Sequence, residues 1–172
     1  VGYCRFIHDY VEQRGIQRVL FLSRDGDILK QVYDRMYPGA DTRYAYWSRS
    51  AAAILGADYF RFDYLRRFLF HKIGGKQRLG QLLAAMELSP ELAGTLLADI
   101  GLSPKHLLTK RNCTQLEEAI LNRWDQVLEG YRDNHAAAKA YYAELLEGCE
   151  TACTVDIGWA GSGGVILSHL VE

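Results

Sequence analysis

The sequence predicts an α/β fold, in which a small Rossmann-like parallel sheet of a three-layer core is interrupted by a large helical insert. Two observations predict this fold. Near the amino terminus, short apolar runs alternate with amphipathic segments, in the βαβ rhythm of a parallel sheet. A further strand-like run appears only at residues 151–157, after a long segment in which strand patterns are absent.

The first 50 residues contain the first strands of this sheet. Residues 1–14 have apolar positions at helical spacing, and Gly15 ends that helix. The continuous apolar run Val19–Leu22 is typical of a buried parallel strand. An amphipathic helix then runs from Ile28 to Met36, and residues 43–47 form the second predicted strand.

Residues 51–149 form the predicted helical insert, or cap, and residues 1–50 and 150–172 form the predicted core. Helices are expected over residues 58–71 and 77–86. Ser89-Pro90 and Ser103-Pro104 each resemble a serine N-cap followed by proline at the first helical position. A capping box at residues 114–117 is expected to open the longest helix, which reaches Leu145.

Composition limits the possible partners and location. The net charge of −1 indicates no nucleic-acid partner, and no apolar stretch reaches the roughly 20 residues of a membrane span. The four cysteines lack the pairing of a zinc site, so free thiols in a reducing, cytoplasmic compartment are expected. The chain begins at Val1 without a methionine and ends in an apolar run, which suggests a piece of a larger protein.

The loop after the first strand is the first candidate for chemistry. It consists of Ser23, Arg24, Asp25, Gly26 and Asp27, directly before a helix. Such a turn points backbone N–H groups and the positive end of the helix dipole outward, and glycine lets a ligand approach closely. Arginine recognises phosphate, and the two carboxylates offer metal binding, nucleophilic attack or proton transfer.

The loop after the third strand is the second candidate. Asp156 lies late in the strand, and a glycine- and serine-rich turn follows that contains Gly161, Ser162 and Gly163. It matches neither the P-loop nor the dinucleotide pattern, and it lacks the P-loop lysine, which argues against a nucleotide triphosphatase. The turn still predicts an anion cradle.

Ser48 and Arg49 follow the second strand, where a hydroxyl and a guanidinium offer further phosphate contacts. Because parallel strands end at the same edge of a sheet, we expect all three loops to converge on one site for a phosphorylated small molecule.

These three segments, at residues 21–26, 46–49 and 155–162, resemble motifs of a bacterial family. The family comprises predicted HAD-superfamily hydrolases that are encoded near, or fused to, glycosyltransferases of surface-polysaccharide loci. The resemblance is to the region that follows the recognisable HAD domain. It implies an HAD-like hydrolase or phosphoryl-transfer module for a phosphorylated sugar or nucleotide-sugar, with a fused or neighbouring glycosyltransferase or HAD domain as partner.

The HAD pattern fits the sequence in two registers. In the first, Asp25 is the nucleophile, Asp27 is the acid/base, Ser48 and Arg49 hold the phosphate, and Asp25 and Asp156 hold Mg²⁺. In the second, which Gly26 favours, Ser23 replaces the nucleophile and the site is inactive. The lysine of the pattern is unplaced, because Lys105 and Lys110 lie in the insert.

Two other functions stay open. The first and third loops also resemble the pyrophosphate and ribose-phosphate loops of type I phosphoribosyltransferases, although Ile157 stands where a second acid is usual. The other alternative is a non-catalytic module that binds a phosphate or sugar ligand and is attached to a glycosyltransferase.

Overall fold

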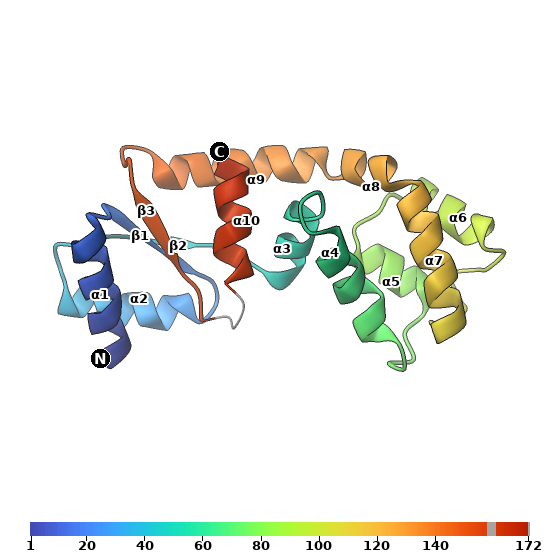
Figure 1. Ribbon diagram of the computed structural model, residues 1–172, viewed down its shortest axis with the longest axis horizontal. Helices are drawn as coiled ribbons and strands as arrows, with labels where there is room; N and C mark the ends of the chain where they lie inside the picture. Colours follow the sequence, from blue (N-terminus) through green and yellow to red (C-terminus); the bar gives the residue numbers. More distant parts are fainter. Residues whose placement is uncertain (158–160, 172) are drawn as a thin grey trace. The chain divides into compact units, whose positions relative to one another are not determined.

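The computed structural model describes residues 1–157 and 161–171, and the chain divides into two compact units. Unit 1 comprises Val1–Ala52 and Ala136–Glu172, and unit 2 comprises Ala53–His135. The predicted core, residues 1–50 and 150–172, lies within unit 1. Unit 1 also includes residues 136–149, which belong mostly to a helix (Figure 1).

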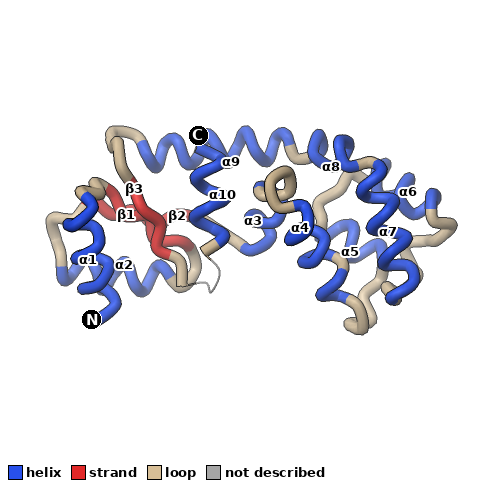
Figure 2. Tube along the Cα trace, in the orientation of Figure 1, coloured by secondary structure: helices blue, strands red, loops and turns tan. Residues whose placement is uncertain are grey.

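Unit 1 contains a parallel sheet of three strands, β1 (Arg18–Leu22), β2 (Asp41–Ala45) and β3 (Ala152–Val155). The order is β2-β1-β3, so β1 is the central strand. All five residues of β1 are buried. The apolar run Val19–Leu22 predicted this for four of them, and the fifth is Arg18. The mixed α/β class with a small parallel sheet is therefore confirmed (Figure 2).

Helices cover both faces of this sheet. Val19 and Phe21 of β1 point to one face, where they pack with α1 (Gly2–Arg14) and α2 (Gly26–Met36). Leu22 points to the opposite face, towards the first turn of α10 (Ser162–Val171). Helix α1 ends at Gly15 in the left-handed conformation with φ 60°, as predicted.

A buried arginine ties the amino end of the sheet to the end of helix α9 (Arg132–Leu146). The Arg18 guanidinium donates to Oδ2 of Asp41 from Nε at 2.8 Å, and Nη2 lies 2.7 Å from the same oxygen. Its Nη1 donates to the backbone carbonyls of Leu145 and Glu147 at 2.7 and 2.8 Å. One side chain thereby joins β1, the start of β2 and the orphan carbonyls of α9.

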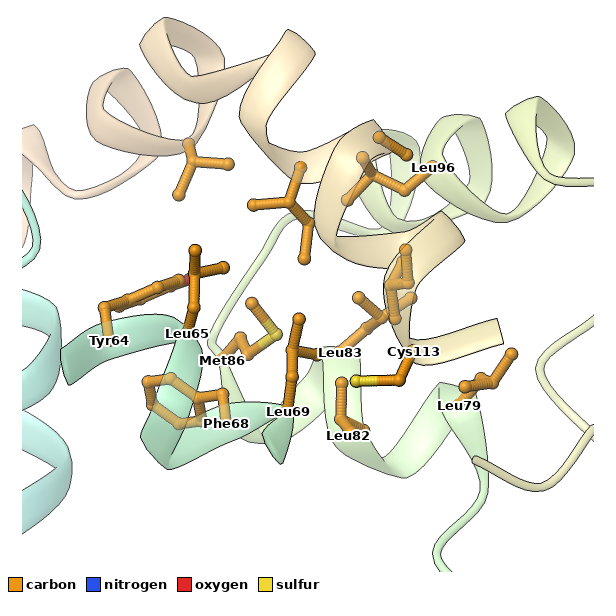
Figure 3. Close-up of a cluster of buried hydrophobic side chains, with 14 of the residues drawn as sticks. Tyr64, Leu65, Phe68, Leu69, Leu79, Leu82, Leu83, Met86, Leu96 and Cys113 are labelled. Atoms are coloured by element: carbon orange, nitrogen blue, oxygen red, sulfur yellow. The ribbon is translucent and has the colours of Figure 1, made fainter. Parts of the chain in front are cut away.

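Unit 2 is helical throughout its described secondary structure. The chain enters it through α3 (Arg49–Leu55), and the elements that follow are α4 (Arg61–Phe68), the short 3₁₀ helix η1 (Phe70–Lys72), α5 (Leu79–Ala85), α6 (Pro90–Asp99), α7 (Lys110–Asn122) and α8 (Trp124–Gly130). Figure 3 shows the apolar side chains of α4 and α5 facing Leu96 and Cys113.

Two tyrosines form a buried hydrogen-bond chain in this core. The Oη of Tyr131 donates to the carbonyl of Met86 at 2.5 Å, so the Tyr64 hydroxyl must donate to Tyr131 Oη, 2.7 Å away. Burial raises the pKa of Tyr131 to about 12, which keeps this donor protonated at neutral pH.

Several predicted helix boundaries in unit 2 are wrong. Ser103-Pro104 opens no helix, because residues 104–108 instead pair with residues 77–80 through an isolated antiparallel bridge. Helix α7 begins at Lys110 with Thr109 as its N-cap, whose hydroxyl accepts from Asn112 N at 3.3 Å. The long predicted helix is three helices, interrupted at Arg123 and Tyr131, whose side chains bind Asp99 and Met86.

The predicted cap at Ser89-Pro90 is confirmed. Ser89 caps α6 by accepting from Leu92 N at 3.2 Å, with Pro90 as the first helical residue. Gly101 follows α6 with φ 65°, and Gly148 follows α9 with φ 74°. In the described part of the chain, no helix has the length and apolar character needed to cross a membrane.

Candidate functional site

The order of the strands defines where a ligand site is expected. The chain leaves β1 for β2 on one side and later returns to β3 on the other side of β1. The gap between the carboxyl ends of β1 and β3 is therefore a topological switch point, where open parallel sheets bind their ligands. The loops after both strands lead directly into helix amino termini, those of α2 and α10.

Ser23 lies at this edge, and its hydroxyl forms hydrogen bonds with the protein backbone. Its Oγ donates to the carbonyl of Trp47 at 2.6 Å and accepts the Trp47 N–H at 2.7 Å. Its own N–H donates to Ala45 O at 2.9 Å. The side chain thus fixes the ends of β1 and β2 together, and its only proton is used in that bond.

Arg24 and Asp25 are exposed in the turn between β1 and α2. Asp25 is the N-cap residue of α2, yet its φ of −63° and ψ of −24° are helical and its carboxylate caps no backbone N–H. Among the described residues, neither side chain forms a hydrogen bond or an ion pair. Asp27, two residues further, is exposed and accepts from Gln31 Nε2 at 3.1 Å.

Gly26 has a steric role. A Cβ at this position would lie 3.0 Å from the backbone carbon of Phe21 and 3.3 Å from its Cβ. Only glycine lets the first turn of α2 approach the end of β1 this closely. The close approach places the N–H groups of α2 directly at the carboxyl edge of the sheet.

Hydrogen bonds at Tyr46 and at Ser48 fix the segment after β2. Ser48 caps α3 because its Oγ accepts the Ala51 N–H at 3.0 Å, which leaves the hydroxyl proton to donate elsewhere. Arg49 is exposed, with no ion pair to another described residue. Tyr46 is fixed by two consecutive tyrosines of α9, since its N–H donates to Tyr141 Oη at 3.0 Å and its carbonyl accepts from Tyr142 Oη at 2.5 Å.

Asp156 directly follows β3 and is half-buried. Phe21 pairs with Val155, so Asp156 lies beside Leu22 at the end of the central strand. The predicted anion loop that follows includes residues 158–160, which lie outside the described part of the structure. Gly161 has φ 62°, and Ser162 begins α10 with its side chain exposed.

Gly163 and Gly164 permit close packing of α10 on the sheet. A Cβ at Gly163 would lie 2.7 Å from Nε1 of Trp47, and one at Gly164 would lie 2.7 Å from Oγ1 of Thr154. Gly163, a predicted phosphate-binding residue, lies against the Trp47 indole. Trp47, treated as the end of a strand in the sequence, is the residue around which Ser23 and Gly163 are arranged.

The described residues contain no cluster of three or more histidine, cysteine or acidic side chains suited to hold a metal ion. The four cysteines are free, and two of them, Cys4 and Cys113, are buried. Asp25 and Asp156 follow neighbouring strands, at positions where one or two carboxylates can bind Mg²⁺ together with phosphate oxygens.

Comparison with protein-family models, with curated proteins and with solved structures gives no match for this chain. The class of protein is therefore given by its architecture, a small parallel α/β unit with a helical second unit.

Proposed function

We propose that the carboxyl edge of the sheet binds a phosphorylated sugar or nucleotide-sugar, and that unit 1 is a Rossmann-like, HAD-like module for phosphoryl hydrolysis or transfer. The observation that carries this proposal is the position of Asp25 together with its lack of a capping hydrogen bond. It lies at a topological switch point and at the amino terminus of α2, and its carboxylate caps no backbone N–H.

The proposed chemistry assigns one role to each side chain. Asp25 attacks phosphorus, and Asp27 transfers the proton of the leaving group. Arg24, Arg49 and the free hydroxyl proton of Ser48 neutralise and orient the phosphate oxygens. Asp25 and Asp156 would hold Mg²⁺, which when bound would offset the charge of the phosphate.

Asp25→Asn tests this assignment. The variant keeps the size of the side chain but removes the nucleophile, so turnover of sugar phosphates in the presence of Mg²⁺ should fall by a factor of roughly a thousand or more. Binding of inorganic phosphate, measured by calorimetry, should persist or strengthen because one negative charge is lost. Equal turnover in Asp25→Asn and in the parent protein would exclude Asp25 as the nucleophile.

A second candidate function is a non-catalytic phosphate-binding module. The hydrogen bond of the Ser23 hydroxyl favours it. In the register set by Gly26 this serine occupies the nucleophile position, and its proton is already bound to Trp47 O. Under this proposal the parent protein binds phosphate without turnover of any sugar phosphate. Arg24→Ala should then weaken phosphate binding by about tenfold, whereas Asp25→Asn should not weaken it.

A further inference from the structure

Unit 2 carries an uneven distribution of charge that the net charge of the chain conceals. No acidic residue occurs from position 64 to 86 or from position 100 to 116. These two segments contain seven exposed lysine and arginine side chains. One of them, Arg66, pairs with Asp63, and the other six are Lys72, Lys76, Arg78, Lys105, Lys110 and Arg111.

The backbone brings the two segments together. Arg78 forms an antiparallel bridge with Leu107, and Leu79 N and Leu108 N donate to His106 O and Gln77 O at 2.9 and 2.8 Å. A Cβ at Gly80 would lie 2.8 Å from the Cβ of Pro104, so glycine is needed for this approach. The two segments that carry the six cations are therefore paired at residues 77–80 and 104–108, and we call these six residues the basic surface.

The cations of the basic surface lack counter-ions. None of the six forms an ion pair with a described residue, whereas three other arginines of unit 2 do. Those pairs join Arg66 to Asp63, Arg123 to Asp99 and Arg132 to Glu129. Unit 2 thus pairs several cations elsewhere and leaves this group open to an external anion.

The first turn of α7 adds to the positive potential. Lys110 and Arg111 are its first two residues, and the turn contains no acidic side chain. The amino terminus of a helix carries partial positive charge, so lysine and arginine there work against the stability of the helix. This placement is explained if the turn faces an anion.

One exposed aromatic ring, that of Phe62, packs near the segment that carries Lys72. Phe62 is 67% exposed, and its ring lies 6.1 Å from that of Phe70, which directly precedes His71 and Lys72. Cations beside exposed rings suit a flexible phosphodiester chain, because the cations bind phosphates while the rings stack on unpaired bases. A double helix would offer its phosphates but would not offer base faces for stacking.

We propose that the basic surface of unit 2 binds single-stranded nucleic acid. The contact is made mainly through phosphates, with Phe62 stacking on a base. This inference is independent of the proposed phosphate site in unit 1, because it rests on residues of unit 2 alone.

The test is fluorescence anisotropy of the full chain with a labelled oligothymidylate of about 20 nucleotides, at salt concentrations from about 50 to 200 mM. If four to six phosphates are neutralised, the logarithm of affinity should fall against the logarithm of salt with a slope of about −3 to −4. Absence of binding at the lowest salt concentration would overturn the proposal.

Charge reversal locates the contact. Lys105→Glu with Lys110→Glu should lower the affinity at least about tenfold and make the slope shallower by about 1.4. The change at position 110 should not unfold α7, because Lys110→Glu introduces a carboxylate where the helix dipole favours one. The matched control is Arg35→Glu with Lys139→Glu, two exposed cations of unit 1. An equal loss in the control would show that only net charge matters and would refute the site.

Two further measurements separate nucleic acid from other polyanions. Phe62→Ala should weaken binding of the oligonucleotide about tenfold at an unchanged salt slope. Polyglutamate of the same length should bind far more weakly than the oligonucleotide. If polyglutamate binds as tightly, or if Phe62→Ala has no effect, the assignment to single-stranded nucleic acid is wrong.

Discussion

The hydroxyl groups of Tyr64 and Tyr131 form a directed chain, and their substitutions should differ for that reason. Tyr131→Phe leaves the carbonyl of Met86 and the hydroxyl of Tyr64 buried without partners, at a cost of about 2–4 kcal/mol. Tyr64→Phe leaves the Tyr131–Met86 bond intact and should cost about 1 kcal/mol. Urea denaturation measures both values.

The double substitution makes this prediction sharper. In the background of Tyr131→Phe, the further change Tyr64→Phe removes an unpaired buried donor, so it should restore part of the lost stability. If the double variant instead loses the sum of the two single losses in unfolding free energy, the Tyr64 hydroxyl does not need Tyr131 as its hydrogen-bond acceptor.

The steric role of Gly26 can be tested by measuring stability alone, without a ligand. Gly26→Ala places a Cβ 3.0 Å from the backbone of Phe21, so α2 must shift and the free energy of unfolding should fall by about 1–3 kcal/mol. Gly39→Ala is the control, because a Cβ there meets no atom within 4 Å, and it should change stability by less than about 0.5 kcal/mol. Equal thermal stability of the two variants would contradict the close approach of α2 to β1.

At the scale of elements, strands were easier to predict than helix boundaries. The run Val19–Leu22 is apolar throughout because β1 is buried on both faces, so its position is clear from sequence. The helix predicted from residue 116 to 145 is interrupted instead at Arg123 and Tyr131. At these positions the Arg123 side chain binds Asp99 and the Tyr131 hydroxyl binds the carbonyl of Met86. Both partners are distant in sequence, so no local pattern reveals these contacts.

The attachment of α9 to the sheet gives a prediction at this scale. Arg18→Lys keeps the charge but loses the forked contact with Asp41 and the carbonyls at the end of α9, at a cost of about 1.5–3 kcal/mol. Arg43→Lys is the matched control, since Arg43 pairs with the same Asp41 from an exposed position, and it should cost less than about 1 kcal/mol. Both losses are measured by urea denaturation. Comparable losses would show that burial does not determine how much an arginine contact with Asp41 stabilises the fold.

At the scale of the whole molecule, the edge of the sheet that carries the candidate loops could be predicted, whereas the pairing of residues 77–80 with 104–108 could not. Parallel strands end at one edge of a sheet, so the loops that contain Asp25 and Asp156 are expected at the same edge, and β1 and β3, which precede them, are paired in parallel. The basic surface depends on the bridge between Arg78 and Leu107, which joins segments that no local pattern connects. The net charge of −1 predicts no nucleic-acid partner, whereas the proposal for unit 2 depends on where charges gather, about which a sum over the chain carries no information.

The two units should also differ in how they fold when separated. Every residue of the core formed by α4 to α8 lies between positions 54 and 131, within the continuous segment of unit 2. Residues 53–135 expressed alone should therefore be helical by circular dichroism and unfold cooperatively on heating.

Leu83→Ala tests whether that core is self-contained. Leu83 is 1% exposed and packs among residues of unit 2, so its truncation should cost about 2–5 kcal/mol. If unit 2 folds on its own, this loss should be the same in residues 53–135 as in the full chain, because all the contacts that are lost lie inside the segment. A much smaller loss in the isolated segment would mean that its core is loosely packed without unit 1, and that the two units depend on each other to fold.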